Sequence, residues 1–263
     1  MLVVLLALGG CKKVEDIPAD LDGVVHYLWD NLEAGSDAAL ADGVVNLDHA
    51  MDGATLTEAF DGSISRLSAG QAEAVGVTDR DPADAAGIFL GNVIHCTLPM
   101  VAEIVTWPDQ AALYTGVYDS YSRDYEGEIG PFLAGDPDEL RWSLEYEASV
   151  LGASYTGHSE ALVRRVKGGD EAPFDEAYLA QFVAPEPAVF EEGSEKTFDQ
   201  DYQFEVYWSR RSGETLHAYA MWREANWGTG FTSEDEGVQR ILLNNMENWD
   251  KDTDEICEDG GPS

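Results

Sequence analysis

Carboxylates, phenols and one imidazole recur at every second position in three segments of the sequence, and these residues are the best suited to chemistry. Alternate residues of an extended strand point to the same side, so side chains at this spacing share one face of a sheet. If Trp142, Trp208 and Trp222 occupy the core face, the opposite face carries Glu145, Glu147, Glu205, Tyr207, His217, Tyr219 and Arg223. That face could bind a polar ligand or another protein, and its carboxylates could supply acid–base catalysis to a hydrolase. A solvated outer face with aromatic cross-strand pairs explains the same residues.

The first eleven residues, MLVVLLALGGC, form an apolar run that ends in two glycines and a cysteine. This segment resembles the signal peptide and lipobox of bacterial lipoproteins, whose lipobox positions are matched by Leu8, Gly9, Gly10 and Cys11. The resemblance implies cleavage before Cys11, a lipid such as palmitate on that residue, and attachment to a membrane of the bacterial cell envelope. Lys12 stands where such proteins carry an Asp for inner-membrane retention, which implies the outer membrane. The basic residues that normally open a signal are absent, so the true start codon stays open.

Cys96 and Cys257 are the other two cysteines of the chain. In an exported protein they could form a disulfide, and closing so long a loop stabilises by about 5 kcal/mol in the chain-entropy model. Alternatively, Cys96 packs as a small buried side chain and Cys257 is free. Sequence spacing gives neither the distance nor the direction that would decide between these states.

Asp250, Asp252 and Asp254 follow a predicted helix at alternate positions, and oxygen ligands at this spacing suit calcium. The segment resembles the opening of an EF-hand loop, but it departs from that pattern at two positions. Glu255 stands where the turn needs glycine, and Gly261 stands where a bidentate glutamate is expected. A weak calcium site and a solvated acidic tail therefore both remain as interpretations, and no other cofactor is predicted.

Other catalytic patterns are incomplete. The histidines do not form a zinc motif such as H-E-x-x-H, and Gly152, Ser154 and Gly157 lack the G-x-S-x-G spacing of a nucleophile elbow. The sequence therefore predicts no catalytic residue beyond the carboxylates of the sheet face.

The chain of 263 residues carries 51 acidic against 15 basic side chains, for a net charge of −36. Such a surface repels phosphate backbones, so nucleic-acid binding is excluded. Seven Trp, eleven Tyr and nine Phe supply a packed core, which excludes intrinsic disorder.

The elements that must position these side chains divide along the chain. Helical spacing of apolar residues predicts helices over residues 36–51, 55–67 and 82–100, the first two after the N-caps Ser36 and Thr55. Alternation of apolar and polar residues predicts strands over 140–148, 154–166, 202–208 and 216–222, with another between 116 and 125. A short helix is predicted over 173–183, and a final helix that ends at Trp249.

We therefore expect an α+β protein, with N-terminal helices followed by an antiparallel sheet of four to five strands and a C-terminal helix. The predicted parts are a signal peptide (1–10), a tether (11–20), a helical part (21–106), a sheet with the final helix (107–249) and a mobile acidic tail (250–263).

The main functional interpretation is a non-enzymatic, lipid-anchored envelope protein that acts through surface interactions with an envelope partner. The first alternative is a carrier of a hydrophobic small molecule, in which the curved sheet encloses a cavity and the final helix covers it. The second alternative is a hydrolase that uses the carboxylates of the sheet face. For the carrier, ordinary core packing explains the same aromatic residues.

Overall fold

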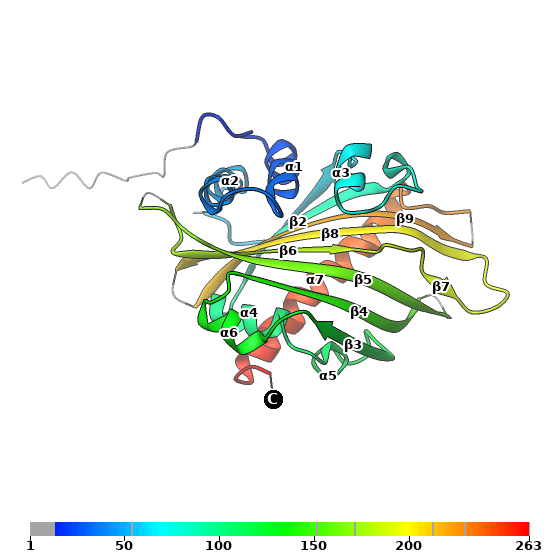
Figure 1. The fold of residues 1–263 in the computed structure, drawn as a ribbon. Coiled ribbons are helices and arrows are strands. Elements are labelled where there is room, and N and C mark those ends of the chain that lie inside the picture. The colour runs from blue at the N-terminus through cyan, green and yellow to red at the C-terminus, as the bar shows by residue number, and fades with distance from the viewer. Residues whose placement is uncertain are drawn as a thin grey trace, which may run out of the picture.

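One long antiparallel sheet forms the centre of the fold, as a computed structural model shows (Figure 1). The structure describes residues 14–53, 55–150, 152–170, 172–211, 213–228 and 230–262. Cys11, the rest of the lipobox and the predicted signal peptide lie outside the described residues. Within the described residues, no helix combines the length and the apolar character needed to cross a membrane.

The sheet has nine strands among the described residues, and every pair of neighbours is antiparallel. The strands are β1 (Phe60–Ile64), β2 (Ala86–Ile94), β3 (Ser120–Tyr125), β4 (Glu139–Val150), β5 (Ala153–Lys167), β6 (Glu176–Val183), β7 (Val189–Phe190), β8 (Lys196–Arg211) and β9 (Glu214–Trp227). Their order is β1-β2-β9-β8-β6-β5-β4-β3, with β7 paired to β5. The α+β class, the antiparallel sheet and the C-terminal helix are thus confirmed, whereas four to five strands was an undercount.

Two tight hairpins join the longest strands. Val150 pairs with Ala153 around Gly152, which has a φ of 77°. Arg211 pairs with Glu214 around Gly213, which has a φ of 85°. Glycine adopts a positive φ without steric cost, so each two-residue turn can follow the twist of its strands.

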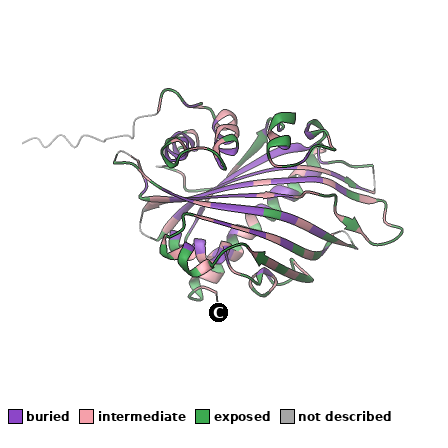
Figure 2. Cartoon of the chain, in the orientation of Figure 1, coloured by how far each residue is buried: buried purple, intermediate pink, exposed green. Residues whose placement is uncertain are grey.

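Helices cover both faces of the sheet, as Figure 1 shows. On the first face lie α1 (Leu21–Asn31), α2 (Asp37–Ala50), α3 (Ala69–Ala74) and the 3-10 turn η1 (Pro82–Asp84). On the second face lie α4 (Leu98–Val105), α5 (Gln110–Leu113), α6 (Ile129–Ala134) and the long α7 (Glu236–Glu258). Burial is therefore concentrated along the strands, between the two helical layers (Figure 2).

The start of the described chain is held against α2. Asn46, which is fully buried, donates from Nδ2 to the carbonyl oxygens of Val14, Ile17 and Pro18, and its Oδ1 accepts from the Val14 N–H. Residues 14–20 therefore belong to the folded body, and the prediction of a tether over 11–20 was wrong for this part.

The predicted helical part over 21–106 contains two strands, β1 and β2, so the helices expected over 55–67 and 82–100 were wrong. Strand β2 lies between β1 and β9, and almost every one of its residues is buried, on one face or the other of the sheet. A strand buried on both faces has an unbroken apolar sequence, which periodicity alone does not distinguish from a buried helix. The same reason explains why residues 176–183 form β6 where a short helix was expected.

The final helix does not end at Trp249, because α7 continues to Glu258. The prediction of a mobile acidic tail from residue 250 was therefore wrong. Asp250 and Thr253 are 1 % and 3 % exposed, so the buried stripe of the helix continues past Trp249.

Candidate ligand-binding site

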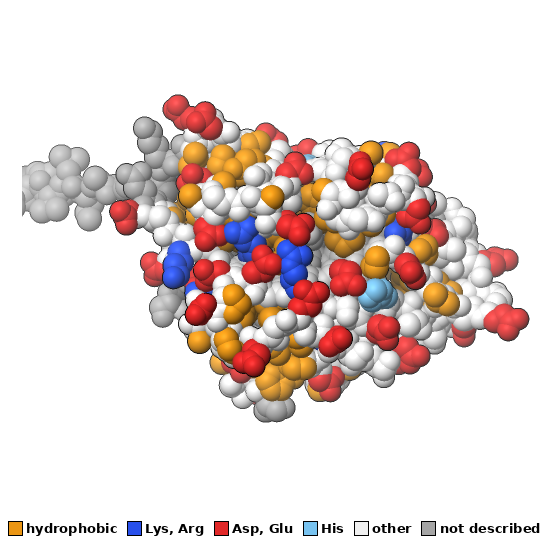
Figure 3. Space-filling view, viewed as in Figure 1, with side chains coloured by type: hydrophobic (Ala, Val, Ile, Leu, Met, Phe, Trp, Pro, Cys, Tyr) orange, Lys and Arg blue, Asp and Glu red, His pale blue; other side chains and the backbone are white. Residues whose placement is uncertain are grey.

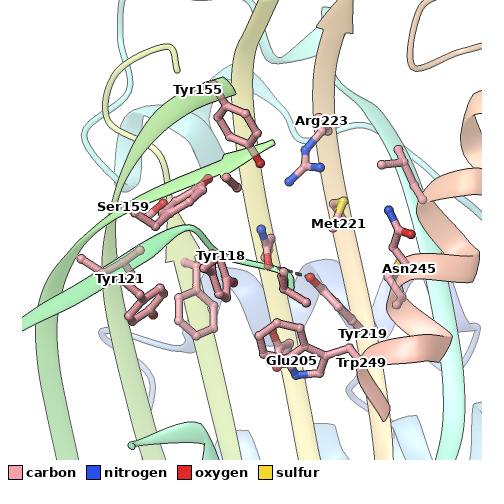
Figure 4. A pocket seen from close by; sticks show the side chains of 18 of the residues that line it. Tyr118, Tyr121, Tyr155, Ser159, Glu205, Tyr219, Met221, Arg223, Asn245 and Trp249 are labelled. Atoms are coloured by element: carbon pink, nitrogen blue, oxygen red, sulfur yellow. Dashed lines mark hydrogen bonds between the residues drawn. The ribbon is translucent and has the colours of Figure 1, made fainter. Parts of the chain in front are cut away.

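A cavity of about 210 Å³ lies between the second face of the sheet and α7. Five tyrosines line it: Tyr118, Tyr121, Tyr146, Tyr155 and Tyr219. Its main apolar lining is Leu144, Phe182, Met221, Leu242, Met246 and Trp249. Arg223 and Glu205 lie at opposite ends of the view of this cavity in Figure 4. The lining thus combines an aromatic and apolar wall with three charged side chains, since Arg123 also belongs to it.

Strand alternation brings the β4 side chains of this wall to one face. Leu144, Tyr146 and Ala148 are alternate residues, so all three point toward the cavity. Tyr146 lies directly opposite Gly157 of β5, where an added Cβ would come within 2.3–2.6 Å of the tyrosine ring and hydroxyl. Gly157 therefore provides the space that Tyr146 occupies, which is a packing role and not the nucleophile turn considered from the sequence.

Helix α7 covers the cavity with one stripe of side chains. Leu242, Met246 and Trp249 recur at spacings of four and three residues, so they lie on one side of the helix. The Trp249 ring stacks on Tyr114 at a centroid distance of 3.7 Å, and Tyr114 Oη lies 2.8 Å from Thr253 Oγ1. Helix α7 is therefore held over the cavity by this ring stacking and by the buried hydrogen bond between Tyr114 and Thr253.

The C-terminal end of α7 is fastened to the segment after β2. Cys96 and Cys257 form a disulfide, with their Cα atoms 5.8 Å apart. The Asp254 carboxylate accepts a hydrogen bond of 2.6 Å from the His95 N–H. Together these bonds restrict movement of the helix away from the sheet.

A chain of polar side chains lies beneath one end of the cavity. His217 is 1 % exposed, and its Nδ1 lies 2.8 Å from Asp250 Oδ1. Its Nε2 lies 3.7 Å from Glu205 Oε2, an ion-pair distance, and this oxygen accepts a hydrogen bond from the Tyr207 hydroxyl. Asn92 Nδ2 donates to the other Asp250 oxygen at 2.8 Å.

The charge of His217 follows from this arrangement. Burial lowers the pKa of the imidazole, but Asp250 and Glu205 outweigh burial and raise that pKa to about 9. At neutral pH, His217 is therefore an imidazolium between two carboxylates, and the Tyr207 ring stacks on it at 4.2 Å.

Arg223 and Asp201 form the ion pair at the other end. Arg223 Nη2 lies 2.6 Å from Asp201 Oδ2, and burial of the guanidinium is offset by this carboxylate, which raises the arginine pKa. Gln203 Nε2 donates to the same oxygen at 3.1 Å, while Gln203 Oε1 accepts from the Tyr219 hydroxyl at 2.6 Å. Burial raises the pKa of the Tyr146 and Tyr155 phenols, so both keep their protons at neutral pH.

The predicted sheet face combined side chains that the structure separates. Trp208 and Trp222 point to the α1 and α2 side, but Trp142 points to the α4 and α7 side. Glu205, Tyr207, His217 and Tyr219 do share the second face, where Glu205 and Tyr219 line the cavity. The assumption that the three tryptophans share one face was therefore wrong.

Glu145 and Glu147 are exposed and lie on the first face, away from Glu205. A pair of catalytic carboxylates made of Glu145 and Glu205 is therefore contradicted by the sheet, because its two members lie on opposite sides.

The three aspartates considered for calcium do not form a calcium loop. They stand on α7, where positions two residues apart point to different sides of the helix. Asp250 is bonded to His217 and Asn92, and Asp254 to the His95 N–H. Among the described residues, no cluster of three His, Cys, Asp or Glu side chains could hold a metal ion.

The sequence did not identify several residues that line the cavity, among them Tyr118 and Asn245. Trp249 was placed on the final helix, but its position over the cavity was not predicted. The sequence did contain one signal for the polar side chains around His217. Asp250 continues the spacing of four set by Leu242 and Met246, and a charged residue on an apolar stripe needs a buried partner. No comparable local signal indicates Tyr118, which precedes β3 in an irregular segment.

No protein-family model matches this chain, and no curated protein matches it. Three solved structures illustrate the similarities in fold. The human StarD13 lipid transfer and protein localization domain gives a TM-score of 0.42 at 7 % identity, over 75 % of this chain and 85 % of that one. A START superfamily protein from Mycobacterium smegmatis gives 0.39 at 9 % identity, over 66 % and 97 % of the two chains. Ara h 8.0201 gives 0.37 at 11 % identity, over 65 % and 97 %. No family assignment follows from similarities at this level.

Proposed function

We propose that this protein binds and carries a small, mainly apolar molecule in the cavity between the sheet and α7. The observation that carries the proposal is the cavity itself, of about 210 Å³, with an aromatic and apolar wall and polar groups at two ends. Binding sites for small molecules have this composition, in which a few convergent polar groups orient a ligand held by apolar contact.

The cavity differs from an ordinary packing defect in size and lining. Protein interiors are close-packed, and few voids exceed one water molecule, whose share of the liquid is about 30 Å³. Five tyrosines and Trp249 surround this space, and aromatic rings offer large contact areas at a low cost in side-chain entropy. The space therefore suits a flat or ring-containing molecule.

The two competing interpretations have less support. The surface-interaction function relied on an exposed face rich in Glu205, Tyr207, His217 and Tyr219, but these four side chains are buried under α7 and α4. The hydrolase relied on carboxylates that share one face of the sheet, but Glu145 and Glu147 lie exposed on the first face and Glu205 lies on the second. A carrier function, in contrast, needs this face to be buried, because the buried side chains form the wall of the cavity under α7.

Binding of N-phenyl-1-naphthylamine, an uncharged dye that fluoresces in apolar surroundings, tests the proposal. We expect saturable binding with one site per chain. Ser159 is 8 % exposed and lines the cavity, so Ser159→Phe fills part of the space and should weaken binding by roughly tenfold or more.

The matched control is Ser122→Phe, because Ser122 is exposed on β3 and outside the cavity lining. Its dye affinity should equal that of the wild type, and thermal melting of both variants checks that they fold. Absence of saturable binding, or equal losses in the two variants, would contradict a ligand in this cavity.

We further propose that a lipid on Cys11 anchors the carrier at the bacterial outer membrane, on the strength of the Leu8-Gly9-Gly10-Cys11 pattern. Acidic side chains spread over the visible face of the molecule, so attachment through anionic headgroups is disfavoured (Figure 3). The denatured mass of protein extracted from membranes should show a chain that starts at Cys11 with an added lipid. A mass that retains Met1 without a lipid would overturn the anchor.

A further inference from the structure

We propose that the cavity recognises an uncharged ligand whose polar end is a hydrogen-bond acceptor oxygen, such as a ketone or ester carbonyl, held by Arg223. The inference rests on the proposed carrier function and adds the chemical class of the ligand and its orientation. It predicts that a carboxylate binds worse than a carbonyl of the same size.

The first argument is an unused donor in the wall. The Arg223 side chain is 14 % exposed, and one of its nitrogens, Nη2, is engaged by Asp201. Nε is buried and has no hydrogen-bond partner among the described residues. Because Nε is closed off from the cavity, the donor open to a ligand oxygen is Nη1, which is not closed off in this way and makes no hydrogen bond within the described residues.

The second argument is direction. Figure 4 shows the guanidinium of Arg223 and the hydroxyl of Tyr155 pointing toward each other from opposite walls of the cavity. The Phe198 ring lies against the guanidinium carbon at 5.2 Å, so this side is closed to a ligand. The guanidinium and the Tyr155 hydroxyl both line the cavity, where we expect one acceptor oxygen to meet Arg223 Nη1 and Tyr155.

The third argument is charge. The Arg223 charge is already balanced by direct contact with Asp201. Arg123, Arg223 and Glu205 line the cavity, and Asp201 is paired with Arg223. The buried His217 between Glu205 and Asp250 completes a set of three positive and three negative side chains. An anionic ligand would add a buried charge without a counter-charge, whereas a carbonyl oxygen adds none.

The position of Glu205 supports the same conclusion. Glu205 lies directly opposite Tyr219, four residues along β9 from Arg223, which places the two ends about 13 Å apart at the usual rise of a strand. A carboxylate ligand would therefore share the cavity with the Glu205 carboxylate. The aromatic wall between the ends accommodates the apolar body of the ligand.

Three probes of nearly equal shape test the inference: 2-acetylnaphthalene, 2-naphthoate and 2-ethylnaphthalene. For the wild-type protein we expect the ketone to bind roughly tenfold tighter than each of the others, which corresponds to about 1.4 kcal/mol. Tightest binding of the naphthoate would overturn the uncharged class, and equal affinities would overturn the role of Arg223. Failure of all three to bind would instead overturn the carrier function.

A double variant assigns the preference to its source. Arg223→Met with Asp201→Asn removes both partners, so no single buried charge is left, and it should abolish the preference for the ketone while ethylnaphthalene binds as before. The control is Arg165→Met with Asp138→Asn, an ion pair of 2.8 Å outside the cavity lining, which should keep the preference. Equal effects of the two double variants would overturn the assignment.

A measurement on the wild-type protein avoids the variants altogether. The ¹³C resonance of 2-acetylnaphthalene labelled at the carbonyl should move downfield on binding, because a guanidinium donor polarises the C=O bond. A bound resonance at the position found in hydrocarbon solvent would overturn the contact with Arg223.

Discussion

The two faces of the sheet are covered by helices in different ways. Under α1 and α2, the Trp29 ring meets Tyr202, Phe204 and Trp222 edge-on, with ring centres 5.4–6.2 Å apart. These four side chains are all at most 3 % exposed. Under α7, the sheet carries tyrosines, ion pairs and a cavity, and the helix is held by a disulfide and a few buried polar bonds.

One sheet can therefore stabilise the fold on one face and leave space for a ligand on the other. Close packing of large rings on the first face contributes a large share of the hydrophobic stabilisation, because this contribution grows with the apolar area removed from water. The second face can then leave space unfilled and bury charges. Its cover is fastened at particular points, such as Asp250 and Cys257, so the cavity does not depend on continuous apolar packing beneath the helix.

The largest expected contrast comes from truncating one phenylalanine on each face. Phe204 is 1 % exposed on the dense face, so Phe204→Ala should lower the free energy of unfolding by about 3–5 kcal/mol. Phe182 lines the cavity, so Phe182→Ala extends a space that already exists and should cost about half as much. Urea denaturation measures both values.

These two variants also serve as mutual controls for binding. Phe182→Ala should change the affinity for N-phenyl-1-naphthylamine, whereas Phe204→Ala should leave it within about twofold. Equal costs in stability together with equal changes in affinity would remove the distinction between the two faces.

A smaller effect is expected from pH, through His217 on the cavity side. Its pKa is raised from 6.5 to about 9, so its contribution to stability is complete below pH 6.5 and is lost as pH rises through 9. At 1.36 kcal/mol per pH unit, the loss in the free energy of unfolding is up to about 3 kcal/mol. Urea denaturation between pH 6.5 and 9.5 should show this decline.

His217→Gln should flatten that decline, because glutamine does not titrate. The control is His158→Gln. His158 also lies near a carboxylate, 3.3 Å from Glu160, but its side chain is 38 % exposed, so its charge is screened by water. If the wild type and both variants show the same dependence on pH, the charged network at His217 does not stabilise the fold.

Local patterns predicted the second half of the fold better than the first. Alternation identified β4, β8 and β9, and the turns at Gly152 and Gly213 were read correctly because glycine with a positive φ has a local signature. Strand β2 was mistaken for a helix because burial on both faces removes the alternation on which the prediction depends. The prediction of the site was also correct only in part. Glu205, Tyr207, His217 and Tyr219 share one face of the sheet as predicted, whereas Glu145 lies on the other face.

The acidic surface, the alternation within single strands and the apolar stripe of α7 follow from composition or from neighbours within a few residues, so they could be predicted before the fold was known. Only the tertiary structure decided that Trp142 and Trp208 lie on opposite faces, that Asp250 meets His217, and that Arg223 and Tyr155 face one cavity. These relations depend on strand order and register and on where α7 lies. Such contacts join residues far apart in the chain, so no local period encodes them.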